Sequence, residues 1–99
     1  MRNLIADLNK SFESRVRLGI MSILMVNDFV DFSTLKEQLH ITDGNLASHL
    51  NALENLKYIN IRKQFIGKKP NTSYATTNVG KKAFSEHLDA LERLINLSS

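Results

Sequence analysis

The hydrophobic period of this chain changes abruptly at Lys57, and that change limits what the chain can fold into. Before Lys57, leucines recur every three or four residues, which is the period of an amphipathic helix. After it, apolar and polar residues alternate from Ile59 to Phe65, as in a half-buried strand. The chain therefore needs a helix that leads directly into a β-hairpin. The helical leucines are Leu46, Leu50, Leu53 and Leu56.

Three further helices are expected before this switch, each marked by an apolar stripe or a capping residue. A short helix opens the chain, and a second one, capped by Ser14, extends to about Val26. Ser33 caps a third helix of barely two turns, and Thr42 caps the helix that carries the leucines. The stripe of the opening helix consists of Leu4, Ile5, Leu8 and Phe12.

The segments after the switch complete the hairpin and add a long helix. Residues 66–72 are rich in turn formers, so we expect residues 73–77 to return as the partner strand. The resulting order predicts a mainly α fold with a small β-hairpin, a winged helix-turn-helix. We place the helix-turn-helix at about 33–56, the wing at about 58–77 and a long terminal helix at about 78–97, all within a single domain of residues 1–99.

Charge is distributed unevenly along the chain. Residues 1–56 and 83–99 each carry a net charge of −2, whereas residues 57–82 carry seven lysines and arginines and no acid. A basic block in an otherwise slightly acidic chain favours binding of a polyanion. The alternative is a solvated, lysine-rich hairpin. The residues expected to contact phosphates are Arg62, Lys63, Lys68 and Lys69.

The leucine-bearing helix turns small or hydrogen-bonding side chains outward. An ordinary exposed helix face carries Lys, Glu and Gln more often, whereas small residues let a helix enter a major groove, where Asn and Ser reach base edges. Gly44 costs this helix roughly 1 kcal/mol, which close approach of its backbone to a phosphate would explain. The alternative is a core helix whose exposed face happens to be small. The outward residues are Asp43, Gly44, Asn45, Ala47, Ser48, Asn51 and Ala52.

The run from Thr42 to Leu50, followed by Leu53-Glu54 and Tyr58-Ile59, resembles the recognition helix of short MarR- and ArsR-like winged-helix regulators. The likeness extends over roughly residues 8 to 97, although Thr76 stands where the family usually has Leu. It implies that Lys68 and Lys69 lie at a wing tip that reaches the minor groove or the phosphates. It also implies that His49 supports packing more than it reads bases. The groove- or phosphate-facing positions that it implies are Thr42, Asp43, Gly44, Asn45, Ala47 and Ser48.

Both ends of the chain carry more apolar residues than so small a core can cover. Members of the resembled family form dimers through their terminal helices, which implies a two-fold homodimer here. Its half-sites should lie about 34 Å apart on a pseudo-palindromic operator. The alternative is a last helix that folds back over its own domain. The expected dimer residues are Leu4, Ile5, Leu8, Phe84, Leu88, Leu91, Leu94 and Ile95.

Nothing in the sequence predicts catalysis, a metal or a cofactor. The chain has no cysteine, and its histidines at 40, 49 and 87 do not fall at metal-ligand spacing. Its richest apolar run, residues 20–30, is too short for a membrane span, and no signal peptide is recognisable, so we expect a cytoplasmic protein. No residue identifies a small-molecule effector.

These observations favour a sequence-specific regulator that binds double-stranded DNA as a homodimer and has no enzymatic activity. Two alternatives remain at this point. One is a winged helix used only for protein–protein docking, which has little need for an acid-free basic hairpin. The other is a non-specific architectural DNA binder. Its affinity for DNA would also fall with salt concentration, as a regulator's would, but it would not prefer one site.

Overall fold

The computed structural model describes residues 3 and 5–98, with side chains as far as Asn96. Four helices and a three-stranded antiparallel sheet of order β1-β3-β2 confirm the mainly α winged-helix prediction. A short 3₁₀ turn, η1, precedes them. In chain order the elements are η1 Lys10–Phe12, α1 Arg15–Met25, β1 Val30–Asp31, α2 Phe32–Leu39, α3 Asp43–Asn55, β2 Ile59–Ile66, β3 Lys69–Thr76 and α4 Asn78–Ser98.

Side-chain caps set the starts of the first three α-helices. Ser14 Oγ accepts from the Arg17 backbone N–H at 3.2 Å, and Thr42 Oγ1 accepts from that of Asn45 at 3.2 Å, as predicted. The predicted cap at Ser33 is wrong. Asp31 takes that role, because its carboxylate accepts from the Thr34 N–H at 2.8 Å, and α2 consequently begins one residue before Ser33.

The predicted opening helix is also wrong. Residues 5–7 form turns, and only η1 is helical in this segment, while Leu4 lies outside the described residues. The side chain of Asn9 accepts from the Ser11 N–H at 2.9 Å, and its own backbone N–H donates to Nδ1 of His87 at 3.0 Å. These bonds give the backbone an alternative to a longer helix.

The hairpin is longer and tighter than predicted. Its strands pair without interruption from Ile59 opposite Thr76 to Ile66 opposite Lys69, so the loop is two residues long rather than residues 66–72. Gly67, at φ +65°, supplies the positive φ that such a loop requires. Pro70 fits within β3 because β1 pairs only with Tyr74 and Ser73, leaving the strand edge open near the tip.

The core forms where α1, α2, α3, the base of the hairpin and the first half of α4 meet. Phe12 is buried in this core, with its ring centroid 5.5 Å from that of Tyr58 and 5.3 Å from those of both Phe84 and His87. Leu56 was expected to complete the leucine stripe, but it is 40% exposed, because α3 ends at Asn55. The fully buried side chains are Phe12, Ile20, Met21, Leu24, Leu35, Leu46, Leu50, Leu53 and Ile59.

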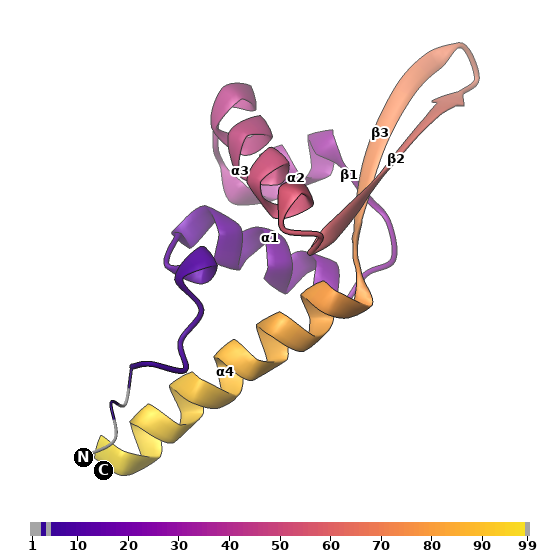
Figure 1. Cartoon of the computed structure of the whole chain (residues 1–99). Helices are drawn as coiled ribbons and strands as arrows, with labels where there is room; N and C mark the ends of the chain where they lie inside the picture. The colour runs from indigo at the N-terminus through magenta and orange to yellow at the C-terminus, as the bar shows by residue number, and fades with distance from the viewer. Residues whose placement is uncertain (1–2, 4, 99) are drawn as a thin grey trace.

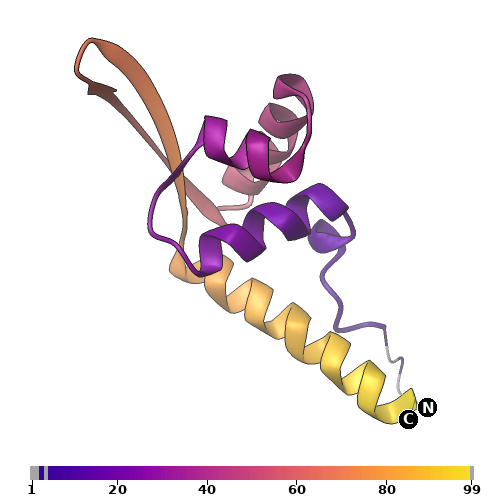
Figure 2. The same ribbon diagram turned by 180° about the vertical axis from the view of Figure 1, so that it is seen from behind.

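The chain is elongated, with extents of 59 × 25 × 21 Å. Figure 1 shows α4 running along one side of the molecule, while α3 and the hairpin tip project from the opposite side. Seen from behind in Figure 2, the N-terminal segment descends toward the far end of α4, where Arg93 donates to Asp7 at 3.3 Å. The fold therefore separates the surface that includes α3 and the hairpin from the surface of α4.

Candidate nucleic-acid interface

A tight turn connects α2 to α3 and fixes where α3 begins. His40 ends α2 in the left-handed conformation at φ 52°, and two residues later Thr42 caps α3. Across this turn Lys36 Nζ of α2 lies 2.8 Å from Oδ1 of Asp43. The ion pair and the helix N-terminus both compensate the Asp43 charge, which reduces the repulsion that this carboxylate would exert on a phosphate.

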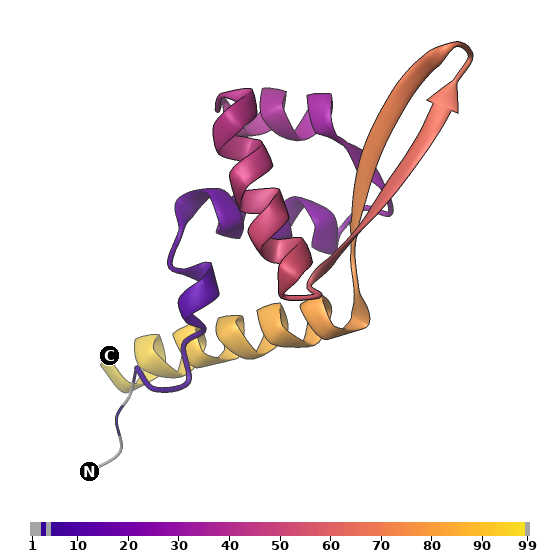
Figure 3. The same cartoon turned by 45° about the horizontal axis from the view of Figure 1, so that its top comes forward.

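The start of α3 exposes the small side chains expected from the sequence. Thr42, Asp43, Gly44, Asn45, Ser48 and Asn51 are exposed, and Ala47 is half-buried. A Cβ added to Gly44 would meet no atom within 4 Å, so packing inside this chain does not require a glycine there. Figure 3, with the top of the molecule turned forward, shows α3 open to solvent on the side away from α1.

His49 connects α3 to α1. Its Nδ1 accepts from Arg17 Nε at 3.1 Å, and Arg17 also donates to the Ser11 carbonyl at 3.5 Å. Burial, and then the Arg17 charge, lower the pKa of His49 below its usual value, so the ring is neutral and able to accept. This geometry gives His49 the supporting contact that the resemblance implied. The role of Arg17 was not predicted, because it lies 32 residues away in the chain.

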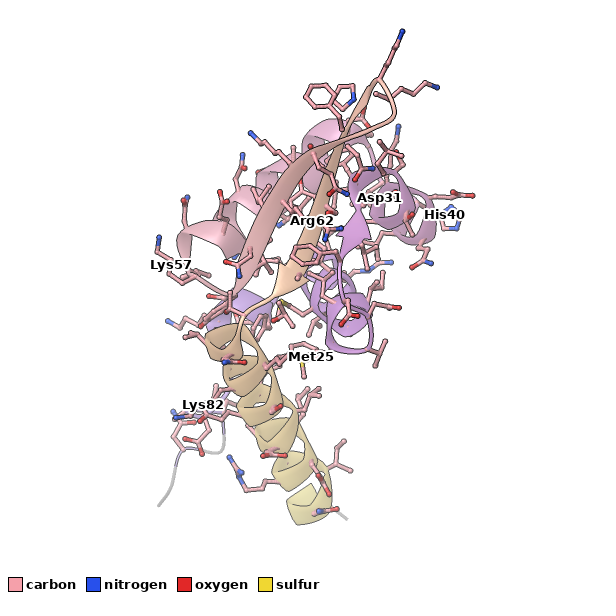
Figure 4. The ribbon with its side chains drawn as sticks, turned by 90° about the vertical axis from the view of Figure 1, so that its right-hand side faces the viewer. Met25, Asp31, His40, Lys57, Arg62 and Lys82 are labelled. Carbon is pink, nitrogen blue, oxygen red and sulfur yellow. The ribbon has the colours of Figure 1, made fainter. Side chains whose placement is uncertain are left out.

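The basic hairpin residues fall into two groups. Lys63, Lys68 and Lys69 are exposed along the outer part of the hairpin. Arg62 is also exposed, but its guanidinium carbon lies 4.0 Å from the ring centroid of Phe29, and its Nε donates to the buried Ser73 hydroxyl at 3.3 Å. Arg62 therefore fastens the base of the hairpin to the loop before β1, as Figure 4 shows near its label.

The profile of the family described as winged helix DNA-binding domain matches residues 16–95. The chain belongs to this family. An uncharacterized protein of Methanocaldococcus jannaschii is 37% identical over 79 residues, which cover 80% of this chain and 86% of that protein. The likeness therefore spans most of both proteins.

Solved structures share this winged-helix fold. A transcriptional regulator homologue from Pyrococcus horikoshii superimposes with a TM-score of 0.75 at 29% identity, covering 88% of this chain and 91% of that one. A MarR-family transcriptional regulator of Porphyromonas gingivalis gives a TM-score of 0.65 at 18% identity, covering 90% and 82%, and shows the fold alone. The predicted resemblance to winged-helix transcriptional regulators is confirmed.

Beyond its first half, α4 of this winged-helix chain carries an uncovered apolar stripe. Leu88 and Ile95 are 45% and 68% exposed, and Leu91 and Leu94 are half-buried. Phe84 is 3% exposed and packs edge-on against Phe12, so its expected place on an uncovered stripe is wrong. The core reaches further along α4 than its leucine spacing indicated.

The N-terminal part of the expected dimer surface is only partly described. Ile5 is 64% exposed and Leu8 is half-buried, while Leu4 falls outside the described residues.

Among the described residues, no group of three His, Cys, Asp or Glu is placed to hold a metal ion. In the same part of the chain, no helix is both long enough and apolar enough to cross a membrane.

Proposed function

We propose that this chain is a sequence-specific, double-stranded DNA-binding transcriptional regulator that acts as a homodimer. One observation carries the proposal: the small, exposed face of α3 and the acid-free basic hairpin project from the same side of the molecule, opposite α4 (Figure 1). In this arrangement α3 lies in the major groove, and the wing contacts the backbone or the adjacent minor groove.

The reading surface is the outward face of α3. Asn45, Ser48 and Asn51 offer hydrogen-bonding groups to base edges, and Ala47 adds little bulk between them. At the start of the helix, Thr42 and Gly44 allow the backbone to approach a phosphate, which the helix N-terminus favours. Three leucines of α3 are at most 1% exposed, so the core holds this face in a fixed orientation.

The wing supplies sequence-independent affinity. Lys63, Lys68 and Lys69 are point charges that would neutralise phosphates and release condensed counterions. Affinity should therefore fall steeply between about 50 and 200 mM salt. An affinity that hardly changes over this range would show that the wing does not contact the DNA backbone.

The outer half of α4 supplies the dimer interface. Two copies related by a two-fold axis would cover Leu88 and Ile95 on both chains, together with Leu91 and Leu94. The N-terminal segment, tied to α4 by Asp7 and Arg93, would extend the same surface. Such a dimer presents two α3 helices to successive major grooves about 34 Å apart.

Selection of bound sites from a random DNA pool tests base recognition by α3 and dimerisation through α4 together. A pseudo-palindromic consensus with half-sites one helical turn apart is expected. Enrichment without a consensus would indicate the architectural binder, and no enrichment at low salt would indicate the docking module. Leu88→Glu with Ile95→Glu should yield monomers in light scattering, whereas the charge-adding control Ser85→Glu, on the same helix, should remain dimeric.

A further inference from the structure

We propose that the wing tip is an apolar wedge, in which Phe65 inserts between base pairs from the minor groove and kinks the bound duplex. The inference rests on the proposed function and adds to it a deformation of the DNA. Phe65 is 73% exposed and Ile66 is 60% exposed, directly before the Gly67-Lys68 loop. Within the described chain these are the large apolar side chains nearest the tip of the hairpin.

The exposed phenylalanine continues the inner face of β2 beyond the core. Side chains alternate along a strand, so Ile59, Ile61, Lys63 and Phe65 share one face. Ile59 is buried and Ile61 is half-buried, but the helices no longer cover the strand at Phe65. Its cross-strand neighbour on this face is Pro70, which adds a second rigid apolar surface.

The two-residue loop makes this tip narrow. Strands of eight residues span roughly 27 Å, and Figure 1 shows the outer part of the hairpin standing clear of the helices. Because a minor groove is only about 6 Å wide, the narrow tip and its side chains, rather than the whole ribbon, would enter it. Hydrogen bonds between paired strands also limit the entropy lost when the tip is ordered on DNA.

The charges around the wedge favour DNA as its partner. Lys63, Lys68 and Lys69 surround the apolar tip, and the chain has no acid between Glu54 and Glu86. An apolar residue with a cationic rim matches a duplex, whose stacked bases are lined by phosphates. The tip also projects from the same side as α3, so it continues the proposed interface (Figures 1 and 3).

Insertion has a physical consequence that can be measured. Apolar side chains that enter a base step from the minor groove unstack it and kink the duplex by about 20–90°. Pyrimidine–purine steps such as TA and CA deform most readily. The wedge should therefore favour these steps at a fixed distance from the bases that α3 contacts, adding specificity outside the reading helix.

The test compares wild type with Phe65→Ala, Phe65→Leu and Lys68→Ala on a 40-bp duplex that carries the pool-selected site. End-to-end energy transfer reports the bend, and 2-aminopurine beside the flanking step reports unstacking. We expect wild type and Phe65→Leu to bend the duplex and raise 2-aminopurine fluorescence, and Phe65→Ala to lose both signals. Lys68→Ala should lower affinity and the salt slope but keep the bend at saturation.

The outcomes separate the wedge from the proposed function. If wild type does not bind the duplex, the proposed function fails; if Phe65→Ala binds and bends DNA as wild type does, only the wedge is overturned. Phosphatidylserine vesicles form a further arm, because a cationic rim around an aromatic residue also suits an anionic membrane. Binding to vesicles that depends on Phe65, without bending of the duplex, overturns the wedge. Unchanged thermal melting of Phe65→Ala shows that the exposed ring does not support the fold.

Discussion

The helix α3 and the hairpin β2–β3 face the same side of the molecule but are built in opposite ways. Helix α3 buries Leu46, Leu50 and Leu53 almost completely and exposes short side chains with one charge, Asp43, in its first turns. The hairpin buries side chains only near its base, where Ile59 lies, and exposes long cationic and apolar side chains beyond it. The contrast separates a surface of fixed geometry, suited to reading bases, from a projecting ribbon suited to backbone contact.

The two regions meet at a hydrogen-bonded joint around Tyr58. Its carbonyl oxygen accepts from Thr76 Oγ1 at 3.1 Å and from the Thr77 N–H at 3.0 Å. Thr77 Oγ1 donates to the Lys57 carbonyl at 2.6 Å and accepts from the Gly80 N–H at 2.9 Å. Thr76 stands where the resembled regulators usually have leucine, and its hydroxyl ties the end of β3 to the turn that connects α3 to β2.

Substitution of Gly80 should have the largest effect, because it destabilises the joint between the hairpin and the turn after α3. A Cβ at Gly80 would overlap the Tyr58 carbonyl oxygen and lie 2.6 Å from Thr76 Oγ1. We expect Gly80→Ala to lower the free energy of unfolding by about 3 kcal/mol, the upper end of the range for overpacking, because the overlap is with backbone. Thermal melting should show a fall of about 12–24 °C.

The matched control for Gly80→Ala is Gly44→Ala, on the exposed start of α3, where a Cβ meets nothing within 4 Å. Its helix should gain roughly 1 kcal/mol from the better propensity of alanine. Equal destabilisation by both substitutions would contradict the structure of the joint. A more stable Gly44→Ala with weakened DNA binding would support close approach of this backbone to phosphate.

Asn45→Ala and Lys68→Ala should separate the two regions by function. Loss of the Asn45 amide should change preference at one base pair per half-site by roughly 1–3 kcal/mol, because base-edge contacts discriminate between bases. Lys68→Ala should weaken all sequences alike and reduce the salt slope by roughly 0.9. Titrations of matched and single-mismatch duplexes at several salt concentrations measure both. If Asn45→Ala weakened every sequence equally, α3 would not be the reading helix.

Where local patterns determine a helix, it could be predicted. The buried leucines of α3 and the caps at Ser14 and Thr42 depend only on residues a few positions apart, and the structure confirms them. The hairpin was placed correctly but its loop was not, since Pro70 and Asn71 have the composition of a turn although they pair with Phe65 and Gln64. Cross-strand register outweighed local turn propensity there.

Contacts between distant segments could not be predicted. The predicted opening helix is wrong because the Asn9 backbone N–H bonds to His87, 78 residues away. Strand β1 could not be predicted because its two residues are too few to show a hydrophobic period. On the candidate interface, the outward face of α3 follows from helical geometry alone. By contrast, the contact of Arg62 with Phe29 could not be predicted, because no sequence pattern indicates that the loop before β1 lies beside β2.

A smaller effect is expected at the contact between Arg62 of β2 and Phe29. The guanidinium of Arg62 lies over the Phe29 ring, and such contacts at exposed sites contribute about 0.5–1 kcal/mol. We expect Phe29→Leu to lower the free energy of unfolding by about that amount in denaturant titrations, with the salt slope of DNA binding unchanged. Val26→Ala, a truncation of a largely exposed side chain nearby, is the control. A changed salt slope in Phe29→Leu would show that Arg62 contributes to phosphate binding only when the ring orients it.

The smallest expected effect is a pH dependence shared by His49 in α3 and His87 in α4. Burial lowers the pKa of both rings, Arg17 lowers that of His49 further, and Glu13 partly opposes the shift at His87. The unfolded chain therefore binds more protons than the folded one as the pH falls. The contribution of the two neutral histidines to the free energy of unfolding is complete above about pH 6.5, and it is lost as the pH falls through their lowered pKa values. Denaturant titrations between pH 5.5 and 7.5 measure the slope. His87→Gln keeps an acceptor for the Asn9 N–H, so it should flatten the slope without unfolding the chain, and an unchanged slope in both His87→Gln and His49→Asn would assign the pH dependence to other groups.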